Sequence, residues 1–201
     1  MSREIPDNNL PVVLLHNIDP SWAPAEKAAV MTEVDRIVME LTSQGHQVFQ
    51  VPVTNEDLPA ILAPFDPGRY IVFNWCEELP GIPHSEARVP LLLEQLGYAY
   101  TGSPPETISL SWDKGSVKAR LSEKGLSTPY GRVFDSFPIE GWNRFPAIVK
   151  PAFEHCSVGI DSNAVVLDEE ALRRQVAHVR EVFAQPALVE DFIDGREFHV
   201  T

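Results

Sequence analysis

Two lysines in the second half of the chain occupy positions where a cation can meet an anionic ligand. Lys150 closes the apolar run FPAIVK at residues 145–150, and Lys114 stands near the start of a predicted helix. A buried lysine needs an anion or a shifted pKa, so a lysine at the end of a strand often faces a ligand. A solvated lysine is an equally open interpretation of Lys150, and most helix lysines are solvated.

A loop and two glutamates near these lysines suit the other parts of a nucleotide. The loop at residues 152–159 could turn backbone N–H groups towards phosphate, although it lacks the pattern GxxxxGK[ST] and an ordinary hairpin fits equally well. Glu190 and Glu197 lie on either side of Asp194–Gly195. A carboxylate can accept two hydrogen bonds from a ribose diol, but solvated acids at strand ends are commoner.

The residue spacing does not indicate a metal site or a nucleophilic catalytic site. The six histidines show no HxxxH or HxH pattern, and no GxSxG motif is present. Cys76 and Cys156 have no metal-ligand spacing, so free thiols in a reducing compartment are expected. Adjacent acids at Glu77 and Glu78 are typical of a solvated loop. The sequence therefore predicts no metal site within these residues.

Composition narrows the partners of the protein. The 201 residues carry a net charge of −13, from 16 basic and 29 acidic side chains, and such a surface repels nucleic acid. A hydrophobic content of 44% permits a real core. No apolar run approaches the roughly 20 residues of a membrane helix, and MSREIPDNN does not resemble a signal peptide. A cytoplasmic protein without a membrane or nucleic-acid partner is expected.

Strand-like runs and helical periodicity alternate in the first half of the chain. Apolar runs predict strands at residues 11–16, 46–53 and 69–75, with a short strand and turn at 98–102. One helix is predicted from Pro24 to Gly45 and another over 85–96. This alternation predicts a parallel sheet flanked by helices, whose ligands gather at the carboxyl ends of the strands.

The second half is predicted to form another module, after a linker at residues 126–129. Ser111 or Asp113 can cap a helix that reaches about Lys124, and Asp168 can cap a second, amphipathic helix. The turn Asp194–Gly195 is a hairpin signal that joins the last two strands. The predicted strands cover residues 131–134, 145–150, 164–167, 186–193 and 196–201.

Three long motifs resemble the ATP-grasp superfamily, and specifically its D-alanine–D-alanine ligase group. They are FNWCEELPG followed by VPLLLEQLGYAYTGSPPETISLSWDKGSVKARLSEKGLSTP, then FPAIVKPAFEHCSVGI, then LVEDFIDGREFHV. The resemblance covers nearly the whole chain. It implies an α/β fold, with a parallel α/β pre-ATP-grasp domain at 1–104 followed by an incomplete α+β ATP-grasp domain at 105–201.

The same resemblance implies roles for individual residues. Lys114 and Lys150 would contact ATP phosphates, Glu197 would hold the ribose, and two further groups would enclose the nucleotide. The closing loop would contain Glu154, Cys156 and Ser157, and the adenine hinge, acting mostly through backbone groups, would contain Glu190, Asp191, Phe192 and Ile193. Such ligases activate a carboxylate as an acyl phosphate, which an amine then attacks. The implied function is an ATP-dependent carboxylate–amine ligase of peptidoglycan biosynthesis.

The chain departs from the family pattern at several places. LLHNIDPSW and FNWCEELPG replace two substrate-side motifs, and His155-Cys156-Ser157 replaces Gly-Ser-Ser in the phosphate loop. A ligase for another amino acid therefore stays open, as does a non-catalytic nucleotide-binding or interaction module. The family's Mg²⁺ ligands and catalytic arginine are expected beyond Thr201, so this chain alone should bind nucleotide weakly without turnover. A homodimer through the N-terminal domain is the expected assembly.

Overall fold

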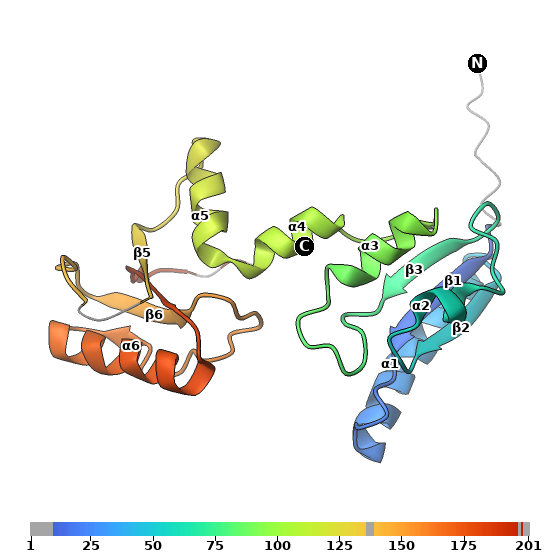
Figure 1. Cartoon of the computed structure of the whole chain (residues 1–201), viewed down its shortest axis with the longest axis horizontal. Coiled ribbons are helices and arrows are strands. Elements are labelled where there is room, and N and C mark those ends of the chain that lie inside the picture. Colours follow the sequence, from blue (N-terminus) through green and yellow to red (C-terminus); the bar gives the residue numbers. More distant parts are fainter. Residues whose placement is uncertain (1–9, 136–138, 197, 199–201) are drawn as a thin grey trace. The chain divides into compact units, whose positions relative to one another are not determined.

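A computed structural model describes residues 10–135, 139–196 and 198, which fall into two compact units (Figure 1). The first unit comprises Met1–Ser109 and the second Leu110–Thr201. The first contains a parallel sheet and the second an antiparallel sheet, which confirms the predicted mixed α/β class. The linker expected at 126–129 does not separate the units, because it lies inside the second one.

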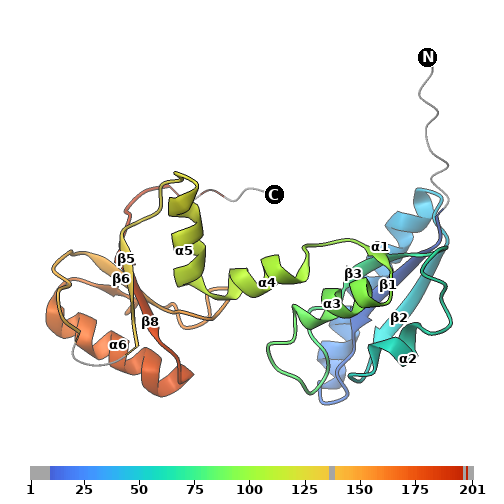
Figure 2. The same cartoon turned by 45° about the horizontal axis from the view of Figure 1, so that its top comes forward.

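The first unit is a four-stranded parallel sheet with the strand order β2-β1-β3-β4. Figure 2 shows β1, β2 and β3 side by side. The strands are β1 (Val12–Asn17), β2 (Val48–Val53), β3 (Ile71–Trp75) and β4 (Ala99–Tyr100). The helices that begin in this unit are α1 (Pro24–Ser43), α2 (Leu58–Leu62), α3 (Arg88–Gln95) and α4 (Pro105–Trp112), the last of which continues into the second unit.

The inner strand β1 is the most buried strand of this sheet. All six of its residues are buried, as expected for a parallel strand that is covered on both faces. Val13 and Leu15 belong to a core cluster with residues of α2 and α3. The long helix α1 begins at a proline and is capped by Glu26, whose carboxylate accepts the Ala23 N–H at 2.7 Å.

The second unit is an antiparallel sheet with the strand order β5-β8-β6-β7. Its strands are β5 (Gly131–Phe134), β6 (Ala147–Pro151), β7 (Val165–Val166) and β8 (Ala187–Asp191). Its helices are α5 (Lys114–Glu123) and α6 (Glu169–Phe183). As predicted, Asp113 caps α5 by accepting the Ser116 N–H, and Asp168 caps α6 by accepting the Ala171 N–H.

The two faces of this sheet differ in what covers them. Buried apolar residues of α6 pack against Val149 and Val189 on one face. The strand register places Gly131, Glu190 and Ile148 side by side on the other face. Lys150 and Leu188 form the neighbouring pair on that same face. Polar groups on β6 and β8 therefore gather on the face away from α6.

Several expectations from the sequence need correction. The helices α2 and α4 were not predicted as separate elements. The strand expected over 186–193 ends at Asp191. Most of the strand expected at 196–201, including Glu197, lies outside the described residues, and so does the completed hairpin. Among the described helices, none is long and apolar enough to cross a membrane.

Candidate functional site

A buried carboxylate on the central strand β8 holds two lysines from different elements. Glu190 is 7% exposed. Its Oε1 accepts a hydrogen bond from Lys118 Nζ at 2.6 Å, and its Oε2 accepts one from Lys150 Nζ at 2.8 Å. Lys150 reaches Glu190 because β6 and β8 are neighbours and both side chains point to the same face. The expected phosphate-binding Lys150 is therefore ion-paired in this structure.

The charges around Glu190 keep it ionised. Burial by itself would raise the pKa of this carboxyl group, but hydrogen bonds and positive charge from Lys118 and Lys150 outweigh that effect. The net result is a pKa below the ordinary value of 4.5. Glu190 is thus a carboxylate at neutral pH, and both lysines have an anion in contact.

Lys118 is the member of this cluster that sequence reasoning missed. It extends from α5 across β5 to reach β8, and Gly131 is the strand residue that it crosses. A Cβ atom at Gly131 would lie 2.9 Å from Lys118 Cε and 3.0 Å from Glu190 Cγ, so the crossing requires glycine there. The sequence contained one indication of its role: Lys118 follows Lys114 by four residues, which places both lysines on one helix face.

Lys114 lies at the base of the candidate phosphate loop. Its Nζ donates to the carbonyl of Pro151 at 3.0 Å and to the carbonyl of Glu154. Burial lowers the pKa of Lys114, and the positive charge of Lys150 acts in the same direction. The structure thus brings together the two lysines predicted to contact phosphate, from α5 and from β6.

The loop after β6 is held by hydrogen bonds to Gln185 and by a hydrogen bond within the loop itself. Gln185 accepts the Phe153 N–H at 2.6 Å and donates to Glu154 Oε1 at 2.8 Å. Cys156 and Ser157 have φ angles of 52° and 61°, and Val158 N–H donates to the carbonyl of His155. Two successive residues with positive φ are typical of a type I′ turn, which usually contains glycine or asparagine.

Two further contacts fix this loop. The His155 ring meets the Trp112 ring edge-on, with 4.2 Å between their centroids. Gly159 has a φ of 74°, and a Cβ atom there would lie 2.6 Å from Pro151 Cγ and 2.8 Å from Phe183 Cζ. The residue that departs from the family pattern, His155, is therefore an anchor of the loop in this structure.

The predicted adenine hinge follows Glu190 at the end of β8. The N–H of Asp191 donates to the carbonyl of Tyr130, and the N–H of Phe192 donates to the carbonyl of Pro146. The Asp191 carboxylate is paired with Arg144 by hydrogen bonds of 2.7 and 2.6 Å. These two N–H groups and this carboxylate are already bonded within the protein, whereas Ile193 is 66% exposed.

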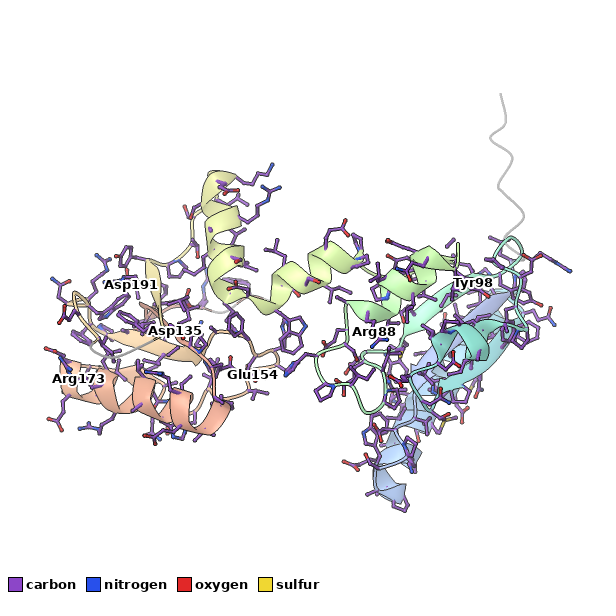
Figure 3. The ribbon with its side chains drawn as sticks, in the orientation of Figure 1. Arg88, Tyr98, Asp135, Glu154, Arg173 and Asp191 are labelled. Atoms are coloured by element: carbon purple, nitrogen blue, oxygen red, sulfur yellow. The ribbon has the colours of Figure 1, made fainter. Side chains whose placement is uncertain are left out.

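Glu154 and Asp191 lie toward opposite ends of the second sheet, as Figure 3 shows. The phosphate loop begins at one end, where β6 stops, and the hinge begins at the other, where β8 stops. Glu190 and Lys150 lie between them on the face away from α6. The expected phosphate and adenine residues are therefore spread along the length of the sheet, with Glu190 and Lys150 on the face away from α6.

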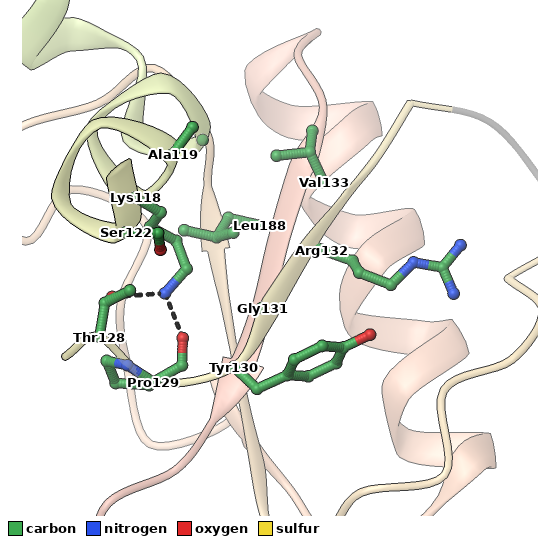
Figure 4. A pocket seen from close by; sticks show the side chains of 11 residues that line it. Lys118, Ala119, Ser122, Thr128, Pro129, Tyr130, Gly131, Arg132, Val133 and Leu188 are labelled. Atoms are coloured by element: carbon green, nitrogen blue, oxygen red, sulfur yellow. Dashed lines mark hydrogen bonds between the residues drawn. The ribbon is translucent and has the colours of Figure 1, made fainter. Parts of the chain in front are cut away.

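A pocket of about 470 Å³ lies between α5 and β5 (Figure 4). Lys118 lines it, but its ammonium group is bonded to Thr128 and to Pro129, as the dashed lines show. Arg132 also lines it, and its guanidinium group donates to the carbonyl of Glu140. The ammonium group of Lys118 has three acceptors, whereas in the described residues Lys150 has Glu190 as its one hydrogen-bonding partner, so Lys150 is the better candidate for phosphate.

No family model matches the chain, but individual known proteins are similar to it. The D-alanine–D-alanine ligase of Aquifex aeolicus is 31% identical over 170 residues, 82% of this chain and 54% of that protein. The Marinomonas ligase is 32% identical over 184 residues, with coverages of 88% and 56%. An uncharacterized protein, y4sG of Sinorhizobium fredii, is 36% identical over 131 residues, with coverages of 65% and 38%.

Solved structures give the same result for the fold. The D-alanine–D-alanine ligase from Bacillus anthracis aligns with a TM-score of 0.66 and 22% identity, covering 92% of this chain and 58% of that one. Its complex with ATP aligns with a TM-score of 0.65, covering 94% and 58%. The parallel sheet followed by the antiparallel sheet is thus the fold of these ligases.

In sequence, too, the chain is homologous to curated D-alanine–D-alanine ligases over most of its length, which confirms the resemblance predicted from its motifs. It spans about half the length of the curated relatives it matches.

Proposed function

We propose that this chain binds ATP on the face of the second sheet away from α6, as part of an ATP-dependent carboxylate–amine ligase. The observation that carries the proposal is that Lys114, from α5, donates to the carbonyl of Pro151, the residue next to Lys150 on β6, while Lys150 pairs with the buried Glu190. The relationship to D-alanine–D-alanine ligases supports it, and one structure with the same fold is an ATP complex.

The charge balance of the cluster suits a polyphosphate. Lys114, Lys118 and Lys150 contribute three positive charges, and Glu190 and the neighbouring Glu154 contribute two negative charges, so the cluster carries a net charge of +1 within a chain of net charge −13. Local positive charge in a partly desolvated site attracts an anion more strongly than the same charge in water. Lysine binds phosphate as a compact point charge that can move to follow it.

The proposed reaction proceeds in two steps. A substrate carboxylate oxygen attacks the γ-phosphorus of ATP, the bond to the β-phosphate oxygen breaks, and ADP leaves an acyl phosphate behind. An amine then attacks the acyl carbon and phosphate departs. Lys114 and Lys150 would stabilise the charge that shifts among the phosphate oxygens during the first step.

Mg²⁺ is expected with ATP from the family. In the part of the chain that the structure describes, no group of three or more His, Cys, Asp or Glu side chains could hold a metal ion. We further propose a cytoplasmic homodimer that acts in peptidoglycan biosynthesis.

Asn17 ties the loop after β3 to β1 at a place where the chain departs from the family motifs. At the carboxyl ends of β1 and β3, Asn17 donates to the carbonyl of Glu78 and accepts the Glu77 N–H at 2.7 Å. The loop after β3 is thus tied to β1 by residues that depart from the family motifs. This observation favours a second candidate, a ligase of the same type for an amino acid other than D-alanine.

Titration calorimetry with ATP tests the binding proposal. Charge-assisted hydrogen bonds to phosphate predict that Lys150→Met and Lys114→Met each weaken ATP binding by about tenfold or more. Lys124→Met, at the exposed end of α5, removes the same charge outside the cluster and should change the affinity by less than about twofold. Equal losses in all three variants, or no binding by the unaltered chain, would refute the proposed site.

A coupled assay for ADP distinguishes the ligase from a nucleotide-binding module. We expect this chain alone to form no ADP in an amino-acid-dependent way. A full-length ligase that contains this chain should form ADP only when its amino-acid substrate is present. A screen of D- and L-amino acids then identifies the substrate, and activity with D-alanine alone would exclude the second candidate.

A further inference from the structure

The two lysines that contact Glu190 are held very differently. Lys118 Nζ has three acceptors, namely Thr128 Oγ1 at 2.8 Å, the carbonyl of Pro129 and Glu190 Oε1 at 2.6 Å. An ammonium group has three hydrogens, so Lys118 is fully used. In the described residues, Lys150 Nζ has Glu190 Oε2 as its one hydrogen-bonding partner. Lys150 can therefore change partner at much lower cost than Lys118.

The exposed fractions of the two side chains also indicate that Lys150 can move more easily than Lys118. The side chain of Lys150 is 25% exposed and that of Lys118 is 14% exposed, while the Glu190 side chain is 10% exposed. If Lys150 turned to a phosphate, Glu190 would lose one of two cations without gaining solvent. A buried carboxylate without any cation is strongly unfavourable, and it avoids that state by taking up a proton.

We infer that Lys118 is a positioning residue for the nucleotide site: it keeps Glu190 ionised and paired, so that Lys150 can exchange this carboxylate for phosphate. The inference rests on the proposed function, because it requires that Lys150 meets a phosphate. Its geometric basis is the crossing of Lys118 over Gly131, which brings a fully bonded ammonium group to the oxygen of Glu190 that Lys150 does not use.

The charged groups that face Glu190 come from two elements. Lys118 and Lys114 belong to α5, and Lys150 belongs to β6. The neighbouring β5 residue, Gly131, has no side chain to contribute. When Lys150 leaves, Lys118 is thus the cation that stays in contact, and replacing it should couple nucleotide binding to proton uptake by Glu190.

The test compares Lys118→Met with the unaltered chain by titration calorimetry with ATP, in buffers of different ionisation enthalpy. Lys118→Met should weaken ATP binding at pH 7.5 by about tenfold, because Glu190 has no cation in contact once Lys150 turns to phosphate. The defect should shrink as the pH is lowered to 6, because a proton taken up by Glu190 replaces the missing cation. Proton uptake on binding should exceed that of the unaltered chain, in which Glu190 stays paired, and the excess should grow as the pH is lowered.

Two further variants complete the test. Lys124→Met controls for lost charge on α5 and should show neither the defect nor the extra proton. Lys118→Arg keeps the positive charge and should bind ATP within about threefold of the unaltered chain, because the contact with Glu190 is conserved. If Lys118→Met does not fold, the test rests on Lys118→Arg. A loss of ATP affinity of tenfold or more in that variant would overturn the inference.

The outcomes separate this inference from the proposed function. If the unaltered chain does not bind ATP, both are overturned. If it binds, and Lys118→Met binds equally well at pH 7.5 or shows a defect of the same size at pH 6, the positioning role is wrong while the nucleotide site stands. A merely structural role for Lys118 would weaken binding at both pH values without extra proton uptake.

Discussion

Replacing Glu190 by glutamine tests whether the buried carboxylate stabilises the second unit. The substitution keeps the shape of the side chain but removes its charge, so that Lys118 and Lys150 lose their shared anion. Removing one partner of a buried ion pair typically costs about 3–5 kcal/mol. Because the two lysine side chains keep 14% and 25% of their exposure to water, we expect a smaller loss of about 2 kcal/mol in the free energy of unfolding.

A matched control lies at the next position of the same strand. Asp191 is also paired, but its partner Arg144 is 53% exposed. Solvent screens such a pair, so Asp191→Asn should destabilise the unit much less than Glu190→Gln. Both substitutions convert a carboxylate to an amide on β8, so their difference compares a buried carboxylate that holds two lysines with a more exposed one that holds a single arginine.

The effect of Glu190→Gln should depend on pH in a defined direction. The folded-state pKa of Glu190 is lowered, so its ionisation stabilises the fold above the ordinary pKa of 4.5. That contribution is lost as the pH falls through the folded-state pKa. The difference in stability between the unaltered chain and the variant should therefore be full at pH 7 and shrink below about pH 4.5.

Pulse-labelling hydrogen exchange along a urea series reads the two units separately, which a single optical signal would not. The peptides that contain β6 and β8 report the free energy of unfolding of the second unit. An equal effect of Glu190→Gln and Asp191→Asn, or a loss that persists unchanged at pH 4, would show that the carboxylate does not act as a buried ion-pair partner.

Two other predictions concern the loop after β6. Gly159→Ala should destabilise the second unit by about 2 kcal/mol or more, because the new Cβ atom meets Pro151 and Phe183 in a residue with positive φ. Gly125→Ala, with a φ of 70° and nothing within 4 Å, should cost only about 1 kcal/mol in the same urea series. His155→Gly removes one ring contact worth about 0.5–1.5 kcal/mol, so amides of the loop should exchange up to about tenfold faster. Unchanged exchange there would mean that His155 does not anchor the loop.

The regular elements were largely predictable from the sequence, because burial imposes their periodicity. The strands of both sheets coincide with apolar runs, and the helices α1 and α6 have amphipathic spacing and readable caps. The helix α2 has only five residues, too few for a periodic pattern to show. Its signals were local ones, an N-terminal Asp57 followed by a proline in the first turn.

The site was predictable only in part, for a different reason. Lys150 and Glu190 were candidates by type and position, but their ion pair depends on the register of two strands. Lys118 gave no signal of its own, because its partner is 72 residues away in the sequence. The turn at Cys156 and Ser157 was not predictable either, since neither residue favours a positive φ.

The strand order of the second sheet has a consequence for how the protein is made. The central strand β8 is the last of the four to be synthesised, and it separates β5 from β6. Until Ala187–Asp191 leave the ribosome, β5 has no neighbour in the sheet and Lys118 has no carboxylate to meet. Because a chain folds its early segments first, the α5–β5 segment must wait with an unpaired edge. The sheet face that carries Lys150 and Glu190 is therefore complete only after β8 has been inserted between β5 and β6.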